Sequence, residues 1–254
     1  MSATADPLTA HRVDVRAPGA LAELTESLAQ HGIAVFTGVS GQAALLGLAR
    51  RLGQVVGHRD ADPSGVTTIT PRPTPATAGA AGFTTRGLRP HTDCSDQAEP
   101  PHLMMLACAQ RALFGGDCVV VDGQAVHAEL ATIEQAALAE LSLPRSALFG
   151  GAAGHLGAVF ETLPGRRVRI RLRTDDQARF SPHVRRRLPL LHHLLDEHAL
   201  AFTLPAGAGY VVNNHRWLHA RTAFTGSRMM RRVLITPHRQ FGLLAGFTPG
   251  PVAS

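Results

Sequence analysis

The residues best suited to chemistry are a histidine and an aspartate two positions apart, His91 and Asp93, within the sequence Pro-His-Thr-Asp-Cys. In an extended segment, side chains two positions apart point to the same side, so one metal ion can bind both. A second histidine from a distant strand would give two histidines and one carboxylate on one face of an iron ion. His219 and His215, in the sequence NNHRWLHAR, are the candidates for that position.

Length and composition predict one domain over residues 1–254, because 254 residues with 44% hydrophobic content can bury one large core. The three cysteines, Cys94, Cys108 and Cys118, are odd in number and have no CxxC spacing, which argues against a disulfide framework and a zinc knuckle. A reducing cytoplasm fits this composition best. We expect no membrane partner, since the sequence has neither a long apolar run nor a signal-peptide pattern at its start.

The formal charge of +6 comes from an excess of arginine and raises the question of a nucleic-acid partner. The arginines are spread along the whole chain, and aromatic residues, at 5%, leave little for base stacking. We therefore expect a small-molecule substrate and no nucleic acid. The sequence leaves the oligomeric state open.

The hydrophobic pattern predicts many strands and a few surface helices. Helices are expected at 21–31, 42–52, 125–141 and 182–198, and strands at 32–36, 102–109, 118–121, 159–161, 168–173, 201–204, 210–213 and 233–237. Because strands and helices do not alternate regularly, this order favours a mostly antiparallel sandwich or barrel with flanking helices.

The segment 57–89 is rich in proline and small residues and contains one short predicted strand. Long irregular segments in a compact domain are often lids or binding loops, so we expect this one to cover the active site; a surface segment without such a role is the alternative. His58 and Phe83 within it, and Ser95 just after the His-x-Asp motif, are predicted to contact the substrate.

Several motifs occur in a recognisable order. They are Pro90–Asp93, then Pro100–Pro101 and an apolar strand, then Gly115–Cys118 leading into Val121–Gly123, then Asn213–Phe224, and finally Arg231–Arg232. This ordered set, over roughly residues 30–240, resembles the taurine dioxygenase (TauD/TfdA) family of Fe(II)- and 2-oxoglutarate-dependent oxygenases.

The resemblance implies a double-stranded β-helix (jelly-roll) core and assigns His91, Asp93 and His219 to Fe(II). His219 is preferred over His215 because it precedes the small-residue-Arg step of the family. Arg232 matches the arginine that binds the distal carboxylate of 2-oxoglutarate, a suitable partner because a guanidinium meets a carboxylate in bidentate fashion. Cys118 stands where the family usually has a threonine whose hydroxyl helps to hold the same carboxylate, and a thiol is a weaker donor.

The reaction implied by the resemblance consumes O2 and 2-oxoglutarate and hydroxylates or desaturates an unactivated C–H bond. The presence of Asp93 argues against halogenation, for which related enzymes leave the carboxylate position to a halide. We expect the substrate to be an amino acid or a specialised-metabolite intermediate. Arg169, Arg171 and Arg173 share one face of their predicted strand. That face is either solvated or, in a jelly roll, turned inward, in which case Arg171 is a candidate partner for a substrate carboxylate. Arg221 is a candidate either for support behind the metal ligands or for a further anion contact.

Two other functions remain open at this level. One is an oxygenase that modifies nucleic acid, but such demethylases carry an Arg-x-Asn-x-Thr-x-Arg signature, and the sequence here is Arg231–Thr236 (RRVLIT). The other is a non-catalytic jelly-roll protein that uses the same histidines and aspartate to bind a metal or another ligand.

Overall fold

The structure, a computed structural model, describes residues 12–73 and 81–250. The larger of its two main sheets is ordered β1-β2-β15-β6-β18-β3, and β4 pairs with β18 on the same sheet. All pairs in it are antiparallel except β1 with β2. The strands are β1 (Arg12–Asp14), β2 (Ile33–Thr37), β15 (Gly209–Asn213), β6 (Leu103–Gln110), β18 (Met229–Pro237), β3 (Gly53–Val56) and β4 (Val66–Ile69).

The smaller main sheet is antiparallel, in the order β14-β8-β16-β5. Its strands are β14 (Leu200–Phe202), β8 (Cys118–Asp122), β16 (Trp217–Arg221) and β5 (Leu88–His91). One buried cluster joins the two sheets, because it combines Met104, Tyr210 and Leu234 of the larger sheet with Val120 and Trp217 of the smaller one. Two mostly antiparallel sheets that face each other across such a core form the expected jelly roll.

The larger sheet is buried on both faces, and successive side chains of its central strands belong alternately to a cluster on its outer face and to the cluster between the two sheets. In β6, Leu103 and Met105 belong to the outer cluster, whereas Met104 and Leu106 belong to the cluster between the sheets. Successive side chains of a strand point to opposite faces, so a continuous apolar run indicates burial on both.

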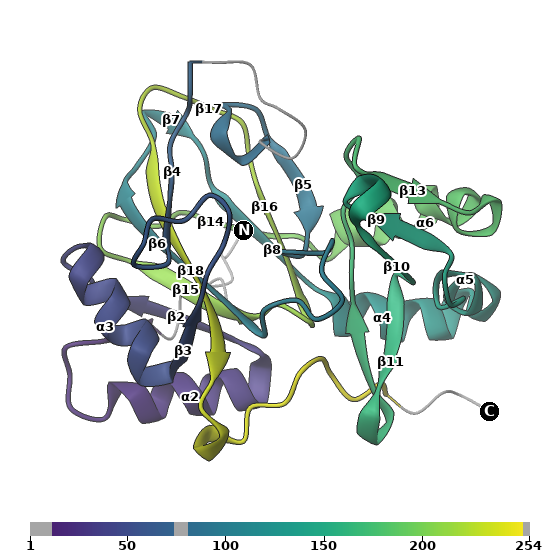
Figure 1. Ribbon diagram of the computed structural model, residues 1–254, viewed down its shortest axis with the longest axis horizontal. Coiled ribbons are helices and arrows are strands. Elements are labelled where there is room, and N and C mark those ends of the chain that lie inside the picture. Colours follow the sequence, from purple (N-terminus) through teal and green to yellow (C-terminus); the bar gives the residue numbers. More distant parts are fainter. Residues whose placement is uncertain (1–11, 74–80, 251–254) are drawn as a thin grey trace, which may run out of the picture.

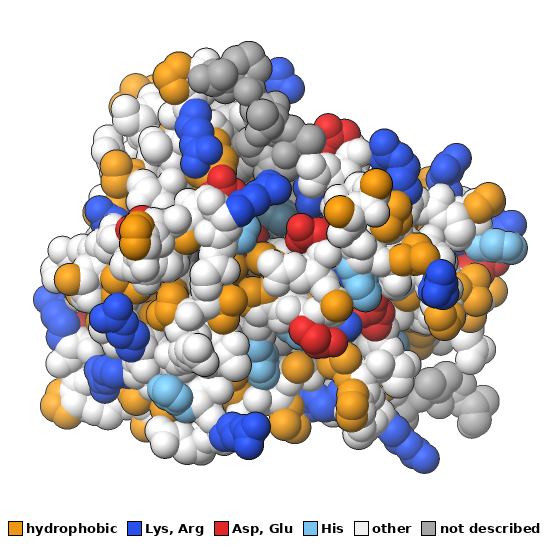
Figure 2. Space-filling view, in the orientation of Figure 1, with side chains coloured by type: hydrophobic (Ala, Val, Ile, Leu, Met, Phe, Trp, Pro, Cys, Tyr) orange, Lys and Arg blue, Asp and Glu red, His pale blue; other side chains and the backbone are white. Residues whose placement is uncertain are grey.

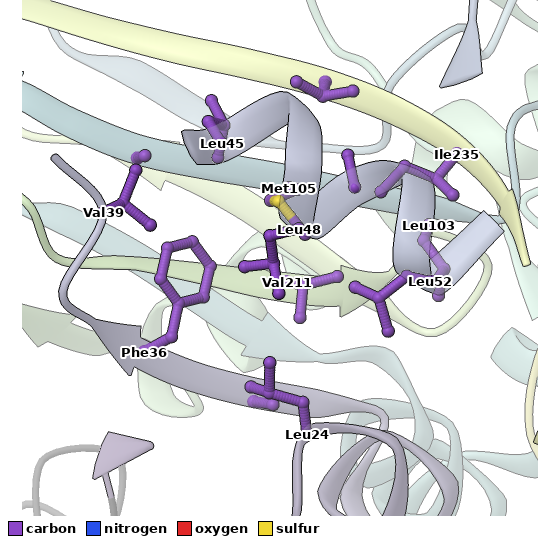
Figure 3. Close-up of a cluster of buried hydrophobic side chains, with 14 of the residues drawn as sticks. Leu24, Phe36, Val39, Leu45, Leu48, Leu52, Leu103, Met105, Val211 and Ile235 are labelled. Atoms are coloured by element: carbon purple, nitrogen blue, oxygen red, sulfur yellow. The ribbon is translucent and has the colours of Figure 1, made fainter. Parts of the chain in front are cut away.

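Helices α2 (Ala20–His31) and α3 (Gln42–Leu52) cover the outer face of the larger sheet, at the lower left of Figure 1. Their leucines, Leu24, Leu45 and Leu48 among them, recur at helical spacing and pack on Met105 and Val211 of the sheet (Figure 3). Both helices end at a glycine, as the sequence predicted.

The outer face of the smaller sheet is covered by α4 (Gly123–Ile133), α5 (Gln135–Leu141) and α6 (Pro182–Glu197), on the right of Figure 1. Val121 and Leu218 of that sheet share one buried cluster with Val126 and Leu191 of the helices. Short pairs complete the fold: β11 (Phe160–Leu163) with β12 (Arg167–Ile170), β9 (Ala147–Phe149) with β10 (His155–Gly157) and β13 (Ala178–Phe180), and β7 (Phe114–Gly115) with β17 (Phe224–Thr225).

Two predicted elements are wrong. The strand expected over 168–173 ends at Ile170, so Arg171 and Arg173 lie beyond it. The single helix expected over 125–141 is two helices, α4 and α5, separated by Glu134, whose φ of −154° and ψ of 71° are not helical. The apolar residues keep a helical period on both sides of this break, so periodicity alone could not locate it. Within the described residues, no helix is long and apolar enough to cross a membrane.

Candidate active site

His91 and His219 lie directly opposite each other in neighbouring strands, because β5 and β16 pair in the register His219–His91. Trp217 faces the core between the sheets, so alternation along β16 turns His219 inward as well. The two imidazole rings are 4.2 Å apart between centroids. Sheet pairing therefore brings together two histidines that are far apart in the sequence.

Asp93 is held beside them by the side chain of Asn214. The backbone N–H of Asp93 donates to Oδ1 of Asn214 at 2.8 Å, and Nδ2 of Asn214 donates to the Asp93 carbonyl at 3.0 Å. The chain then turns sharply at Cys94, whose φ of 53° is unusual for a residue other than glycine. Asn214 thus ties the aspartate of the His-x-Asp motif to the turn that precedes β16.

The ligand atoms of His91, Asp93 and His219 all lie within 4.8 Å of one another, which suits one metal ion. Nδ1 of His91 donates to the carbonyl of Arg89 at 2.9 Å, which leaves Nε2 unprotonated for a metal. Oδ1 of Asp93 accepts a hydrogen bond from Arg232 at 2.6 Å, whereas the buried Oδ2 has no partner in the described part of the chain. The buried Nδ1 of His219 also has no hydrogen-bond partner among the described residues, so each of the three side chains keeps an atom that can bind a metal ion.

The charge states also suit a divalent cation. Burial lowers the pKa of His91 below its ordinary value and the pKa of His219 to about 3, so both imidazoles are neutral near pH 7. Burial is the largest single influence on Asp93 and opposes its ionisation, but Arg232 and the three neighbouring histidines together outweigh it and lower the pKa of this carboxyl. Neutral imidazoles and an ionised carboxylate are the forms that bind metal.

His215 does not join this group. Its ring Nε2 lies 3.1 Å from the carbonyl oxygen of Pro100, and its side chain is buried elsewhere. The structure thus places the preferred histidine, His219, and not the alternative, beside His91 and Asp93.

A cavity of about 540 Å³ opens beside His91 and Asp93, which form part of its wall. His58, Phe83 and Ser95, predicted to contact the substrate, line it, together with Arg232. Charged residues of both signs also line it: Arg59, Asp60, Arg89, Asp96, Arg173 and Asp175. In Figure 2, histidine, acidic and basic side chains lie close together in the upper middle of the face, where Figure 1 labels β5 and β16.

Arg171 lies elsewhere than predicted. It does not line the cavity; its 1% exposed guanidinium donates to the backbone carbonyls of Ser95 at 2.7 Å and Ala98 at 3.0 Å and pairs with Glu161. Arg169, at 7% exposed, is buried as well, so these two arginines do not form a solvated surface. Arg171 holds the loop after Asp93 instead of presenting a free charge to a substrate.

Arg221 has a similar position on the other wall. It is buried and donates to the carbonyls of Gly82 at 3.1 Å and Thr84 at 2.8 Å, and it does not line the cavity. The expectation that it contacts an anion is therefore not supported. It ties the end of segment 57–89 to β16, next to His219.

Two inward-facing arginines of the β18 region lie at different ends of the site. Arg232 contacts Asp93 and, at 3.3 Å, His58. Nη2 of Arg228 lies 3.9 Å from Sγ of Cys118. Arg228 was not predicted from the sequence as a site residue, although it is an even number of positions from Arg232 and so points to the same face of an extended segment. Arg231 lies on the opposite face, as expected, where it lines a separate cavity.

A jelly roll that holds two histidines and a carboxylate on one face, beside a cavity, is the arrangement of non-haem iron oxygenases. The model of the family described as "Taurine catabolism dioxygenase TauD, TfdA family" matches residues 4–234, and the chain belongs to this family. It is a 2-oxoglutarate-dependent dioxygenase that uses iron, and the family expected from the sequence motifs is confirmed.

Solved structures agree on the fold. An asparagine oxygenase in complex with Fe(II), hydroxyasparagine and succinate superimposes with a TM-score of 0.68 at 18% identity, over 85% of this chain and 77% of that one. The non-haem iron oxygenase OrfP, in complex with iron, succinate and a dihydroxylated arginine, gives a TM-score of 0.69 at 18% identity over 93% and 87% of the two chains. PvcB from Pseudomonas aeruginosa gives 0.65 at 17% identity, over 85% and 79%.

Proposed function

We propose that this dioxygenase hydroxylates an amino acid or a similarly small, charged molecule, with His91, Asp93 and His219 as the ligands of Fe(II). The observation that carries the proposal is the convergence of these three side chains, within 4.8 Å of one another, beside the cavity. When bound, the iron and 2-oxoglutarate supply the oxidising chemistry that activates O2.

The cavity supports a small, polar substrate. Its volume of about 540 Å³ is within the usual range for small-molecule sites. Arg89 and Asp96 line it without an ion pair in the described part of the chain, so groups of opposite charge are available for an ammonium and a carboxylate group. Two of the similar structures contain hydroxylated asparagine and arginine, which favours an amino acid.

The position of each residue in the site indicates a different role for it. Asn214 fixes the backbone of Asp93, and Arg232 is the strongest of the neighbouring groups that favour ionisation of its carboxyl. Arg232, predicted from the family motif to bind 2-oxoglutarate, lies at the metal end, where it can orient a carboxylate close to the iron. Arg228, beside Cys118, is the better placed of the two for the distal carboxylate. Segment 57–89, whose described residues form part of the cavity wall, would shield the reaction from water.

The test is anaerobic addition of Fe(II) and then 2-oxoglutarate to the purified protein. We expect the weak visible charge-transfer band of this class, succinate formation in air, and the gain of one oxygen atom by one member of a panel of amino acids, detected by mass spectrometry. Asp93→Ala should abolish the band. Asp96→Ala, which changes an exposed carboxylate on the same loop, is the matched control and should keep it.

A protein that binds Fe(II) but forms neither the band nor succinate would support the non-catalytic alternative. A single domain over 1–254, a cytoplasmic location and the absence of a nucleic-acid partner stay predictions from the sequence.

A further inference from the structure

The hydroxyl group of Tyr210 is buried and has no hydrogen-bond partner in the described part of the chain. Tyr210 is fully buried on β15, with its ring packed edge-on against Phe202 at 5.6 Å. A buried polar atom without a partner costs free energy, and in native proteins it usually indicates a ligand, a water molecule or a functional role. The active-site residues described so far do not use this hydroxyl.

The position of Tyr210 relates it to the co-substrate. Its side chain belongs to the cluster between the two sheets, together with Cys118 and Met230. In the larger sheet Tyr210 and Arg232 pair with opposite sides of the same residue, Leu106, so both lie at one level of the sheet. Tyr210 therefore faces the interior space between the metal ligands and the Cys118 end of the site.

The electrostatic surroundings agree with this placement. Burial raises the pKa of Tyr210 well above its ordinary value, and Cys118, Arg228 and Asp93 are the charged or ionisable groups that act on it. The phenol is therefore protonated near pH 7 and can donate a hydrogen bond. No carboxylate or carbonyl of the described chain accepts it.

Cys118 is a poor donor at the position where the family usually has a threonine hydroxyl. Its thiol is 2% exposed, and burial raises its pKa to about 11, so it stays a neutral S–H group. A thiol donates weakly compared with a hydroxyl. At this end of the site, position 118 therefore does not provide the hydroxyl that usually donates a hydrogen bond to the distal carboxylate of 2-oxoglutarate in this family.

We propose that the Tyr210 hydroxyl donates a hydrogen bond to the distal carboxylate of 2-oxoglutarate and replaces the donor that Cys118 does not provide. The inference rests on the proposed function, since it assumes that 2-oxoglutarate extends from the metal ligands toward Arg228. Tyr210 then binds the co-substrate from the larger sheet, across the core from Cys118 of the smaller sheet.

The experiment measures equilibrium binding, without turnover. The anaerobic Fe(II) protein is titrated with 2-oxoglutarate, and the visible band gives the Kd for the wild type, Tyr210→Phe, Cys118→Thr and the double variant. A hydrogen bond to a charged group predicts a Kd about tenfold or more higher for Tyr210→Phe. The double variant, which regains a hydroxyl at position 118, should return to within about threefold of the wild type.

A 2-oxo acid that lacks the distal carboxylate, 2-oxobutyrate, is the matched ligand control. Its Kd should be the same for the wild type and for Tyr210→Phe, because the hydroxyl would contact only the missing group. Tyr210→Phe should also unfold at the same or a higher temperature, since it removes an unpartnered polar atom from the core.

An unchanged Kd for 2-oxoglutarate in Tyr210→Phe would overturn the inference, as would an equal loss of affinity for both oxo acids. If instead the wild type gave no band with 2-oxoglutarate, the proposed function would fall as well. If Tyr210→Phe did not fold, Cys118→Thr would still decide: a second donor next to an existing one should tighten binding by less than about threefold, and a much larger gain would show that Tyr210 donates nothing.

Discussion

Two buried arginines, Arg169 and Arg171, hold the loop that follows Asp93, and Arg171 makes more of the contacts to its backbone. The guanidinium of Arg171 donates to the carbonyls of Ser95 and Ala98 and pairs with Glu161 at 3.3 Å. We predict that Arg171→Met destabilises the protein severely. The reason is that the carbonyls of Ser95 and Gln97 would lose their side-chain donor, and Glu161 one of its two arginines, in the buried interior.

The size of the effect follows from these contacts. Removing one partner of a buried ion pair typically costs about 3–5 kcal/mol, a large part of the roughly 5–15 kcal/mol of an ordinary domain. Glu161 keeps a second arginine, Arg169, which limits the loss to the lower part of that range. Arg171→Lys keeps the charge but not the planar fork, so we expect a smaller loss of about 1–2 kcal/mol.

The assay is urea unfolding of the metal-free protein, followed by the fluorescence of Trp217, which is the only tryptophan of the chain and is 5% exposed. Arg179→Met is the control. Arg179 is exposed and donates only to carbonyls of its own turn, so its loss should change the free energy of unfolding by less than about 0.5 kcal/mol.

The sequence alone predicted that Arg171 binds a substrate carboxylate. In that case Arg171→Met would weaken substrate binding and leave the free energy of unfolding unchanged. If Arg171→Met unfolded at the same urea concentration as the wild type but raised the KM for the substrate, the structural role argued above would be refuted.

Three further predictions concern other contacts. Asp122→Ala removes the N-cap of α4 and both hydrogen bonds to Arg216 (2.9 and 2.7 Å), so urea unfolding should show a loss of about 2 kcal/mol. Burial, together with neighbouring His102, lowers the pKa of His215 from its ordinary 6.5 to about 3. As the pH falls below 6.5, His215 of the unfolded chain binds a proton and His215 of the folded protein does not, so the free energy of unfolding decreases until the pH reaches about 3. From pH 7 to pH 5 this amounts to about 2 kcal/mol, and the same unfolding series on His215→Gln should lack that share. Arg228→Met should weaken binding of 2-oxoglutarate about tenfold or more and leave Fe(II) affinity unchanged, whereas Arg232→Met should weaken both; the reverse pattern in a titration would contradict the assigned positions.

Local patterns in the sequence predicted a mostly antiparallel sandwich or barrel with flanking helices, and the pairing of His91 with Asp93. The alternation and the apolar runs gave most central strands, and glycine caps placed the ends of α2 and α3. His91 and Asp93 follow from the two-residue repeat of an extended segment. The choice of His219 over His215 needed the order of the family motifs, and the structure places it with the other two.

Only the tertiary structure decided where the arginines point. Arg171 and Arg221 belong to extended segments that run past the cavity, but their guanidinium groups end on backbone carbonyls of the neighbouring loops. The path of those loops depends on contacts between residues 70 or more positions apart, which no local pattern records. The pairing of Arg228 with Cys118 and the unpartnered hydroxyl of Tyr210 have the same origin, because facing sheets bring their inner side chains together only when the whole core is assembled.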